Sequence, residues 1–426
     1  MKKFRVEFSE NLLTGNAGLT HFGRFIKKLN LKKIIDNNIC IPRGSNAEYQ
    51  VSDVVIILII GAIAGVKHMS QIAILRIDEV LRTLFNWDQF PADSTLGRIF
   101  KLFTQSSCNQ LSEVENIIRR KVWGKKWFGR ITLELDSSVR GVYGSQEGAE
   151  AGYNPKKKNQ KSYHPLFCFI SETRECLHNW FRAGNAYSGN GAVEFIQECY
   201  SRLPKRVWKI FVRGDSAFFN GALLDVLEEK GALYLIKVKL KNLTKILTVQ
   251  EWKQIKNRPG YEGTEFEYQC TGWTRPRRFV AIREYVKKET EEGIEYETRE
   301  YCYVTNERLS PWKAHKTYGQ RAASENWIDW CKNHVGGGSI LTQDFWANSA
   351  IFQCSIFAYN LIVWMMFLCK GEKLREEPNT IRFWLINVPG KLLTSSRQYV
   401  IKLSKNWYYK KKWLEIEHFL DKVQFT

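Results

Sequence analysis

The segment "KIFVRGDSAFFNGALLDVLEEKGALYLIKVK" (Lys209–Lys239) decides the fold class of this chain. Its first apolar run predicts a strand that ends at Asp215, and the rest predicts a helix and then a second strand. This order of elements is typical of α/β proteins. An alternating strand in "RITLELDSSVRGVYG" (130–144) ends at Asp136 in the same way. Aspartates at strand ends are often only turn or cap residues, but functional residues also collect at the carboxyl ends of such strands.

The rest of the chain falls into segments that differ in residue pattern and composition. Between residues 237 and 306, "TEFEYQC", "RFVAIREYV" and "IEYETREYCYVT" alternate with period two, which predicts an antiparallel β-strand insertion. The first 45 residues are expected to form an irregular, mildly basic arm. We therefore expect an arm and a helical DNA-binding region over 1–125, an α/β core over 126–236 and 307–372, the insertion over 237–306, and a basic, aromatic region over 373–426.

The charge of the chain indicates the class of its partner. The 426 residues include 64 Lys and Arg against 44 Asp and Glu, a formal net charge of +20. An excess of this size points to a polyanion, most simply nucleic acid. The alternative is a basic protein whose charge only favours solubility. Hydrophobic residues make up 44% of the chain, which argues against a disordered protein.

The cysteines and the apolar runs bear on the compartment. The 10 cysteines include no CxxC pair, so neither a zinc site nor a disulfide scaffold is expected. The first residues, "MKKFRVEFSENLL", lack the apolar core of a secretory signal. The apolar runs 54–66 and 356–369 are too short to cross a bilayer and predict core helices. We expect a cytoplasmic protein with no membrane partner.

A short helix is predicted in "FPADSTLGRIFKLF" (90–103), with Asp93 or Ser94 as its cap. Arg98 and Lys101 lie off its apolar face, which consists of Leu96, Ile99, Phe100 and Phe103. A helix of this form can read DNA as the second helix of a helix-turn-helix. It can equally be an ordinary helix of a bundle.

Four polar side chains recur at steps of three, four and seven in "KTYGQRAASENWIDWCKNH" (316–334), namely Tyr318, Arg321, Glu325 and Lys332. A continuous helix turns about 100° per residue and would place them within an arc of about 60°. Its opposite, buried side would carry Ala323, Trp327 and Trp330. The alternative is a solvated charged face with pairing one helical turn apart.

Three carboxylates are candidate metal ligands: Asp136, Asp215 and Glu325. Hard divalent cations such as Mg²⁺ prefer oxygen ligands. Two such ions can activate an attacking oxygen and stabilise a leaving one during phosphodiester transfer. The expected cofactors are therefore two Mg²⁺ ions, for which Mn²⁺ could substitute. Arg321 can grip a phosphate bidentately, and Lys332 can act on it as a point charge.

The spacing Tyr318-x2-Arg321-x3-Glu325-x6-Lys332 matches the Y-x2-R-x3-E-x6-K signature of cut-and-paste DDE transposases of bacterial insertion sequences. Further segments resemble the thirteen-eighty insertion-sequence family from about Ser94 to near the C-terminus. They are "LELDSSVRGVYGSQEGAEAGYNPKKKNQKSYHPL", "FRAGNAYSGNG", "VRGDSAFF" and "NSAIFQCSIFAYNL".

The resemblance implies an RNase H-like core interrupted by the β-strand insertion between the second and third acids. Asp136, Asp215 and Glu325 would form the metal-binding triad, and Tyr318, Arg321 and Lys332 would contact phosphates of the transposon end. A tryptophan of the insertion would stack on a flipped base. Trp252 and Trp273 are both candidates, and either could instead be a core residue.

The reaction that the resemblance implies has four phosphoryl-transfer steps. A metal-activated water nicks one strand at the element's end, the freed 3′-OH attacks the opposite strand to leave a hairpin, a second water opens the hairpin, and the 3′-OH attacks target DNA. The partners are then double-stranded terminal inverted repeats and target DNA, and synapsis of two ends implies a homodimer. The alternatives are a related nuclease that cuts without joining and a catalytically silent DNA-binding protein.

Two basic segments are further candidates for DNA contact. "YNPKKKNQKSYHP" (153–165) carries Lys156, Lys157, Lys158 and Lys161 with no acid, and a loop after a catalytic strand would meet phosphates. The alternative is a solvated loop. "NWYYKKKW" (406–413) combines rings with lysines, which suits DNA or a partner subunit. It is equally typical of the amphipathic edge of a C-terminal subdomain.

Overall fold

The computed structural model describes residues 5–6, 12–124, 126–152, 154, 157, 159–187, 189–290, 293–339, 341–371, 376–395 and 398–425. Two compact units make up the chain. One consists of Trp123–Ile328, and the other combines Met1–Val122 with Asp329–Thr426. Each unit is described by itself below.

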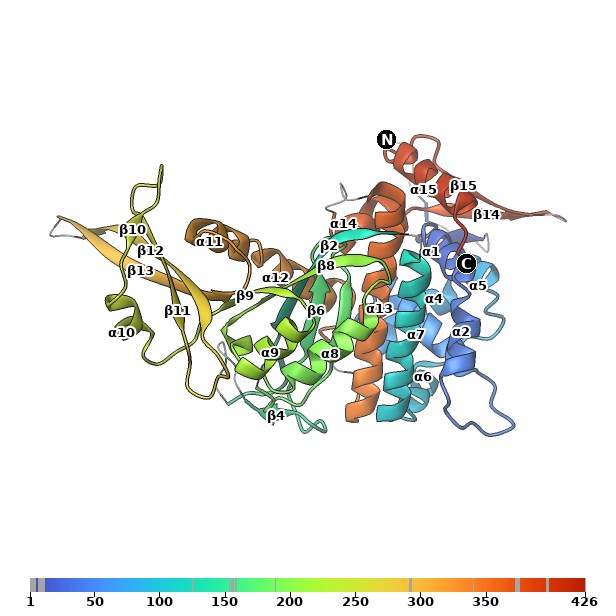
Figure 1. Cartoon of the computed structure of the whole chain (residues 1–426). Helices are drawn as coiled ribbons and strands as arrows, with labels where there is room; N and C mark the ends of the chain where they lie inside the picture. The colour runs from blue at the N-terminus through green and yellow to red at the C-terminus, as the bar shows by residue number, and fades with distance from the viewer. Residues whose placement is uncertain are drawn as a thin grey trace. The chain divides into compact units, whose positions relative to one another are not determined.

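The unit Trp123–Ile328 is built on a mixed sheet of nine strands (Figure 1). At its centre β2, β8 and β9 run parallel, and the other neighbouring strands pair antiparallel. In spatial order the strands are β10 (Lys253–Gln254), β11 (Tyr261–Tyr268), β12 (Arg277–Thr290), β13 (Gly293–Thr305), β9 (Leu233–Lys237), β8 (Val207–Gly214), β2 (Phe128–Ser137), β6 (Leu166–Ile170) and β7 (Cys176–Trp180). The predicted α/β class is confirmed.

The helix between β8 and β9 forms where the sequence predicts it. In α9 (Gly221–Glu229), Asn220 caps the first turn by accepting a hydrogen bond from the Ala222 amide at 2.9 Å. The chain leaves the helix through Gly231, whose φ of +66° suits glycine. The unit also contains α8 (Ala192–Arg202), α10 (Leu243–Thr248), η2 (Ser216–Phe218) and a small sheet of β3 (Arg140–Gly141), β5 (Lys161–Tyr163) and β4 (Glu150–Ala151).

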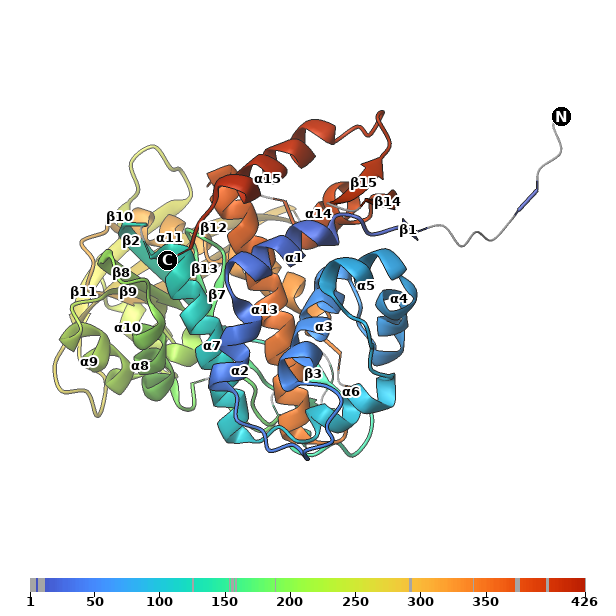
Figure 2. The same cartoon turned by 90° about the vertical axis from the view of Figure 1, so that its right-hand side faces the viewer.

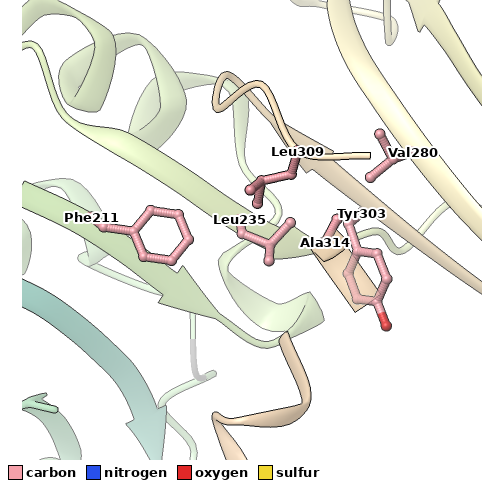
Figure 3. Close-up of a cluster of buried hydrophobic side chains, with 6 residues drawn as sticks. All are labelled: Phe211, Leu235, Val280, Tyr303, Leu309 and Ala314. Atoms are coloured by element: carbon pink, nitrogen blue, oxygen red, sulfur yellow. The ribbon is translucent and has the colours of Figure 1, made fainter. Parts of the chain in front are cut away.

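The predicted antiparallel strands of the insertion continue the central sheet. β13 pairs with β9, so that Tyr303 lies opposite Lys237 and Thr305 opposite Leu235. A hydrophobic cluster joins the insertion to the core strands and to the helix that follows (Figure 3); it consists of Phe211, Leu235, Val280, Tyr303, Leu309 and Ala314. The insertion and the parallel strands therefore share one sheet and one core.

The other unit is mainly helical (Figure 2). Its longest helix, α13 (Phe345–Lys370), packs against the apolar helix α3 (Val51–Ala64), and both are buried on almost every side. The remaining elements are α1 (Leu19–Lys28), α2 (Leu31–Asn38), η1 (Met69–Ile72), α4 (Ala73–Ile77), α5 (Glu79–Phe85), α6 (Asp93–Phe100), α7 (Gln105–Trp123), α14 (Pro378–Ile381), η5 (Arg382–Ile386), α15 (Lys410–Lys422) and a sheet of β1 (Leu13–Thr14), β14 (Gly390–Thr394) and β15 (Tyr399–Leu403).

Two sequence-based expectations about this unit are wrong. Residues 19–38 form helices α1 and α2 where an irregular arm was expected. The reason is a helical apolar face, in which Leu19, Phe22 and Phe25 are fully buried. The capping prediction for α6 also fails, because Ala92 is the N-cap and no side chain caps the helix.

The apolar runs form core helices as predicted, but the argument from length does not hold for α13. With 26 residues, this helix is long and apolar enough to cross a membrane, and 83% of its most apolar window is buried inside the structure. Helices Val51–Ala64 and Met69–Ile77 together also pass that length test, with a bend of 91° between them. Burial, rather than length, is what identifies α13 as a core helix here.

Candidate active site

The two strand-end aspartates lie side by side. Strands β2 and β8 are parallel, and the last pair of their register joins Leu135 to Gly214, so Asp136 and Asp215 follow as the next pair of positions. The carboxylate of Asp215 accepts a hydrogen bond from the Ala217 amide at 2.9 Å and caps the short helix η2. The parallel register thus brings together two acids that are distant in sequence.

Asp136 is in an unfavourable environment for a carboxylate. Burial raises its pKa to about 6, and the neighbouring charge of Asp215 acts in the same direction. The guanidinium of Arg321, 2.8 Å away, and the Ser137 amide, also at 2.8 Å, lower the pKa but do not offset these effects. The pair of aspartates therefore favours additional positive charge nearby.

Arg321 supplies the counter-charge in this structure. Its side chain is buried, and the Nη2 atom that pairs with Asp136 also donates to the Leu135 carbonyl at 3.2 Å. Burial alone would lower the pKa of Arg321, but Asp136 and then Tyr318 and Asp215 raise it above its ordinary value. Arg321, which is predicted to contact phosphate, is thus paired with Asp136, a candidate metal ligand.

The predicted continuous helix through residues 318–332 is wrong. Helix α11 (Pro311–Gly319) ends before Arg321, α12 (Ala322–Asp329) begins after it, and a π-helical turn, η3 (Trp330–His334), follows. The Arg321 amide bonds to the Tyr318 carbonyl at 2.9 Å instead of to Thr317, whose carbonyl accepts from the guanidinium of Arg213. A contact from the sheet thus lies at the point where the helix is interrupted.

The interruption changes the predicted arrangement of the four polar residues. Tyr318 is half-buried in α11, and Glu325 is exposed on α12. Lys332 lies in η3, which belongs to the other compact unit. On the side expected to be buried, Trp327 is buried and Trp330 half-buried, but Ala323 is exposed.

Tyr318 packs beside the aspartates and the hydrophobic cluster. Its ring lies 4.7 Å from that of Tyr303, centroid to centroid. Burial raises its pKa to about 12; Arg321 lowers the value and Asp215 raises it. The phenol is therefore a neutral hydrogen-bonding group that faces the carboxylates.

A buried ion pair, which sequence reasoning missed, supports this region. Glu134 and Arg213 are register partners on β2 and β8, and their exposed fractions are 0% and 4%. Arg213 Nε donates to Glu134 Oε1 at 2.9 Å, and its Nη1 donates to Gln320 Oε1 at 3.2 Å and to the Thr317 carbonyl. The pair ties the junction of α11 and α12 to the sheet. The signal in the sequence is a charged residue two positions before each aspartate, which alternation places on the same face.

His164 is a second residue that the sequence did not single out. Its ring nitrogens lie 2.7 Å from the Ala186 carbonyl and 3.0 Å from Ser137 Oγ. Burial lowers its pKa, and the charge of Asp215 opposes that effect. The histidine braces the segment that follows Asp136.

The three predicted acids do not form a metal cluster in this structure. Across the described residues, no group of three or more His, Cys, Asp or Glu side chains could hold a metal ion. Asp136 and Asp215 together are a donor set that suits a hard divalent cation. Glu325 is on the same segment as Arg321 but is not gathered with them.

A family model for "Transposase DDE domain group 1" matches residues 1–424. The chain belongs to this family of transposases. No curated protein matches it. Among solved structures, it is similar to the cryo-EM structure of a piggyBac transposase synaptic complex with hairpin DNA, with 14% identity and a TM-score of 0.43 over 86% of this chain and 78% of that one. A likeness at this score carries no argument about the site.

The two insertion tryptophans of the transposase have different surroundings. Trp273 lies against Phe219, at 5.2 Å between centroids, in the segment that follows Asp215. Trp252 packs under the guanidinium of Arg283, which is 4.0 Å from its ring centroid. Both rings are half-buried, and base stacking by either remains a prediction.

The basic candidates of the transposase lie on its surface where they are described. Arg98 is exposed on α6 and donates to Thr95 Oγ1 at 3.0 Å, while the apolar face of that helix is buried as predicted. Lys157 is exposed, with Nζ 3.0 Å from the Tyr143 hydroxyl, and Lys161 is exposed on β5. Lys156 and Lys158 lie outside the described residues.

The aromatic and basic segment 406–413 is amphipathic. Tyr408 is 87% exposed, whereas Trp413 is buried. Lys412 pairs with Glu376 at 2.6 Å. One side of the segment packs into its unit, and Tyr408, Lys410 and Lys411 face solvent.

Proposed function

We propose that this transposase moves a bacterial insertion sequence of the thirteen-eighty family by cut-and-paste transposition. One observation carries the proposal: Asp136 and Asp215 end adjacent parallel strands, and Arg321, from the segment that also carries Glu325, reaches them. A strand-end acid pair with a cation from the signature segment is what metal-dependent phosphodiester chemistry needs.

The proposed core is RNase H-like, with β2, β8 and β9 as its parallel centre and the insertion between the second and third acids. Asp136, Asp215 and Glu325 would hold two Mg²⁺ ions, or Mn²⁺ as a substitute. When bound, the ions would activate an attacking oxygen and stabilise a leaving one. A bound ion would then replace Arg321 as the positive charge beside Asp136.

The other signature residues would act on the DNA. Released from Asp136, Arg321 would grip a phosphate of the transposon end. Tyr318 would donate a hydrogen bond near the same phosphate, and Lys332 would add charge. The proposed partners are double-stranded terminal inverted repeats and target DNA, bound by a homodimer in the cytoplasm of the cell. The end would pass through a hairpin intermediate.

A cleavage assay with Glu325→Gln tests the triad. The substrate is a labelled duplex with the element's own terminal repeat, incubated with and without Mg²⁺ and resolved on a denaturing gel. The wild type should give a Mg²⁺-dependent nick and then a hairpin. Glu325→Gln should give neither, yet bind the duplex as well as the wild type, because the basic surface is unchanged.

Asp329→Asn is the matched control, since Asp329 is an exposed acid one helical turn further along α12. It should cleave normally. Cleavage by Glu325→Gln at the wild-type rate would overturn the triad. Nicks without hairpins or joined strands would indicate a nuclease that does not join, and tight binding without any cut would indicate a silent DNA-binding protein.

A further inference from the structure

Two tryptophans are conspicuously exposed at the amino ends of the central strands. Trp127 precedes β2 and is 62% exposed, and Trp208, near the start of β8, is 78% exposed. Single exposed apolar residues are common on protein surfaces, but exposed aromatic residues that share a face and have cations nearby mark a candidate contact site. Neither residue takes part in the candidate active site.

Strand pairing places the two tryptophans on one face of the sheet. Phe128 pairs with Val207 and Arg130 with Lys209, so Gly129 falls opposite Trp208. Because side chains alternate along a strand, Trp127, Gly129 and Trp208 belong to one face. A Cβ atom at Gly129 would lie 3.5 Å from the ring of Trp127. The ring of Trp127 therefore lies near the position opposite Trp208.

Exposed cations precede Trp208 in the sequence. Lys205 and Arg206 are both exposed, and within the described part of the chain no acidic side chain pairs with them. Lys209 is also exposed, but it follows Trp208 on β8 and therefore belongs to the opposite face, with its register partner Arg130. We call Trp127, Lys205, Arg206 and Trp208 the tryptophan patch.

The tryptophan patch is separate from the aspartates. Nine residues lie along β2 from Trp127 to Asp136, which corresponds to about 30 Å of extended strand. A group bound at the metal ligands therefore does not reach the patch. A long DNA strand could contact both regions.

We propose that the tryptophan patch binds single-stranded DNA, with bases stacked on Trp127 and Trp208 and phosphates on Lys205 and Arg206. Exposed rings stack readily on unpaired bases, and cations beside rings are the usual combination for single strands. An apolar protein partner would have to desolvate two unpaired cations, which is costly. The proposal rests on the proposed function for the source of its ligand, the DNA strands freed during cleavage and transfer.

The test measures binding of the full chain to a labelled 20-nucleotide oligothymidine and to a 20-base-pair duplex by fluorescence anisotropy. Trp127→Ala/Trp208→Ala should weaken oligothymidine binding at least about tenfold, as expected for loss of base stacking, and duplex binding less than about twofold. Trp127→Phe/Trp208→Phe should restore most of the affinity. Lys205→Gln/Arg206→Gln should weaken binding and reduce the salt dependence by about 0.7 per lost phosphate contact.

Lys27→Gln/Lys33→Gln is the matched control for charge, since both lysines are exposed in the other unit. It should leave oligothymidine binding within about twofold. Unchanged oligothymidine affinity in the double alanine variant would overturn the proposal, as would a change in oligomeric state by light scattering without a change in DNA binding. Loss of oligothymidine binding by the double alanine variant, together with the absence of any Mg²⁺-dependent cleavage by the wild type, would leave the patch standing and overturn the proposed function.

Discussion

Two neighbouring pairs of residues on β2 and β8 face the same side of the sheet and differ sharply in their electrostatics. Glu134 and Arg213 have opposite charges, are fully buried and satisfy each other. One step along the strands, Asp136 and Asp215 have like charges, and Arg321 is the cation that pairs with the first of them.

The difference separates a structural pair from a functional one. The Glu134–Arg213 pair holds the junction of α11 and α12, which places Arg321 and Tyr318 over the sheet. The Asp136–Asp215 pair is left with an unfavourable arrangement that added cations would relieve. Local frustration of this kind is expected at functional sites and needs a satisfied framework beside it.

The largest expected effect comes from neutralising one acid of the Asp136–Asp215 pair. Asp215→Asn should reduce strand cleavage at least about a thousandfold, because the variant lacks a proposed metal ligand worth several kcal/mol of barrier stabilisation. Asparagine can still cap η2, and removal of one like charge relieves Asp136, so the thermal midpoint should not fall. Denaturing gels and calorimetry measure the two quantities. Cleavage at the wild-type rate would show that Asp215 does not belong to the active site.

Breaking the Glu134–Arg213 pair should instead affect the stability of the fold. Arg213→Met leaves Glu134 buried without its partner and should lower the free energy of unfolding by about 3–5 kcal/mol. Glu134→Leu/Arg213→Met should recover most of this loss, since a packed apolar pair replaces a buried ion pair at little cost. Urea denaturation of the three proteins provides the comparison. A loss below about 1 kcal/mol in the single variant would show that the pair is not structural.

Arg321→Ala tests the cation that the Glu134–Arg213 pair helps to place and that pairs with Asp136. It removes a charge-assisted contact worth about 2 kcal/mol, so hairpin formation should slow roughly thirtyfold while end binding changes less than about threefold. Single-turnover gels and anisotropy separate the two. An unchanged hairpin yield would mean that Arg321 only neutralises Asp136.

The smallest expected effect concerns Glu417, a partly exposed carboxylate in the helical unit. Burial on its own would raise the pKa of Glu417, but His21, 2.9 Å away, and Arg24 lower it to about 2. Its contribution to stability is therefore present above pH 4.5 and is lost as the pH falls toward 2, by about 1–2 kcal/mol after screening. Glu417→Gln should flatten that part of the stability curve. Identical acid unfolding in both proteins would contradict the assignment.

The parts of the fold that depend on local patterns could be predicted from the sequence. Alternation and apolar runs locate β2, β8 and α9, and with them the strand-end positions of Asp136 and Asp215. The face of Leu19, Phe22 and Phe25 in α1 was equally visible in the sequence, but the basic residues around it favoured an arm.

The parts that depend on contacts between distant residues could not be predicted. At the break in the helix before Arg321, the Thr317 carbonyl accepts from Arg213, which lies about a hundred residues earlier in the chain. The placement of Trp127 and Trp208 on one face depends on strand register, which the sequence does not specify. The gathering of Glu325 with the aspartates stays a prediction.

The discontinuous helical unit has a consequence for biosynthesis. Helix α3 buries nearly every side chain, and its main partner, α13, begins about 280 residues later. At about 5–20 residues per second, a ribosome needs roughly 15 to 60 s to make the intervening chain. During that time α1, α2 and α6 can cover part of α3, and the surface that α13 covers later has to be shielded by chaperones or by transient contacts until α13 emerges.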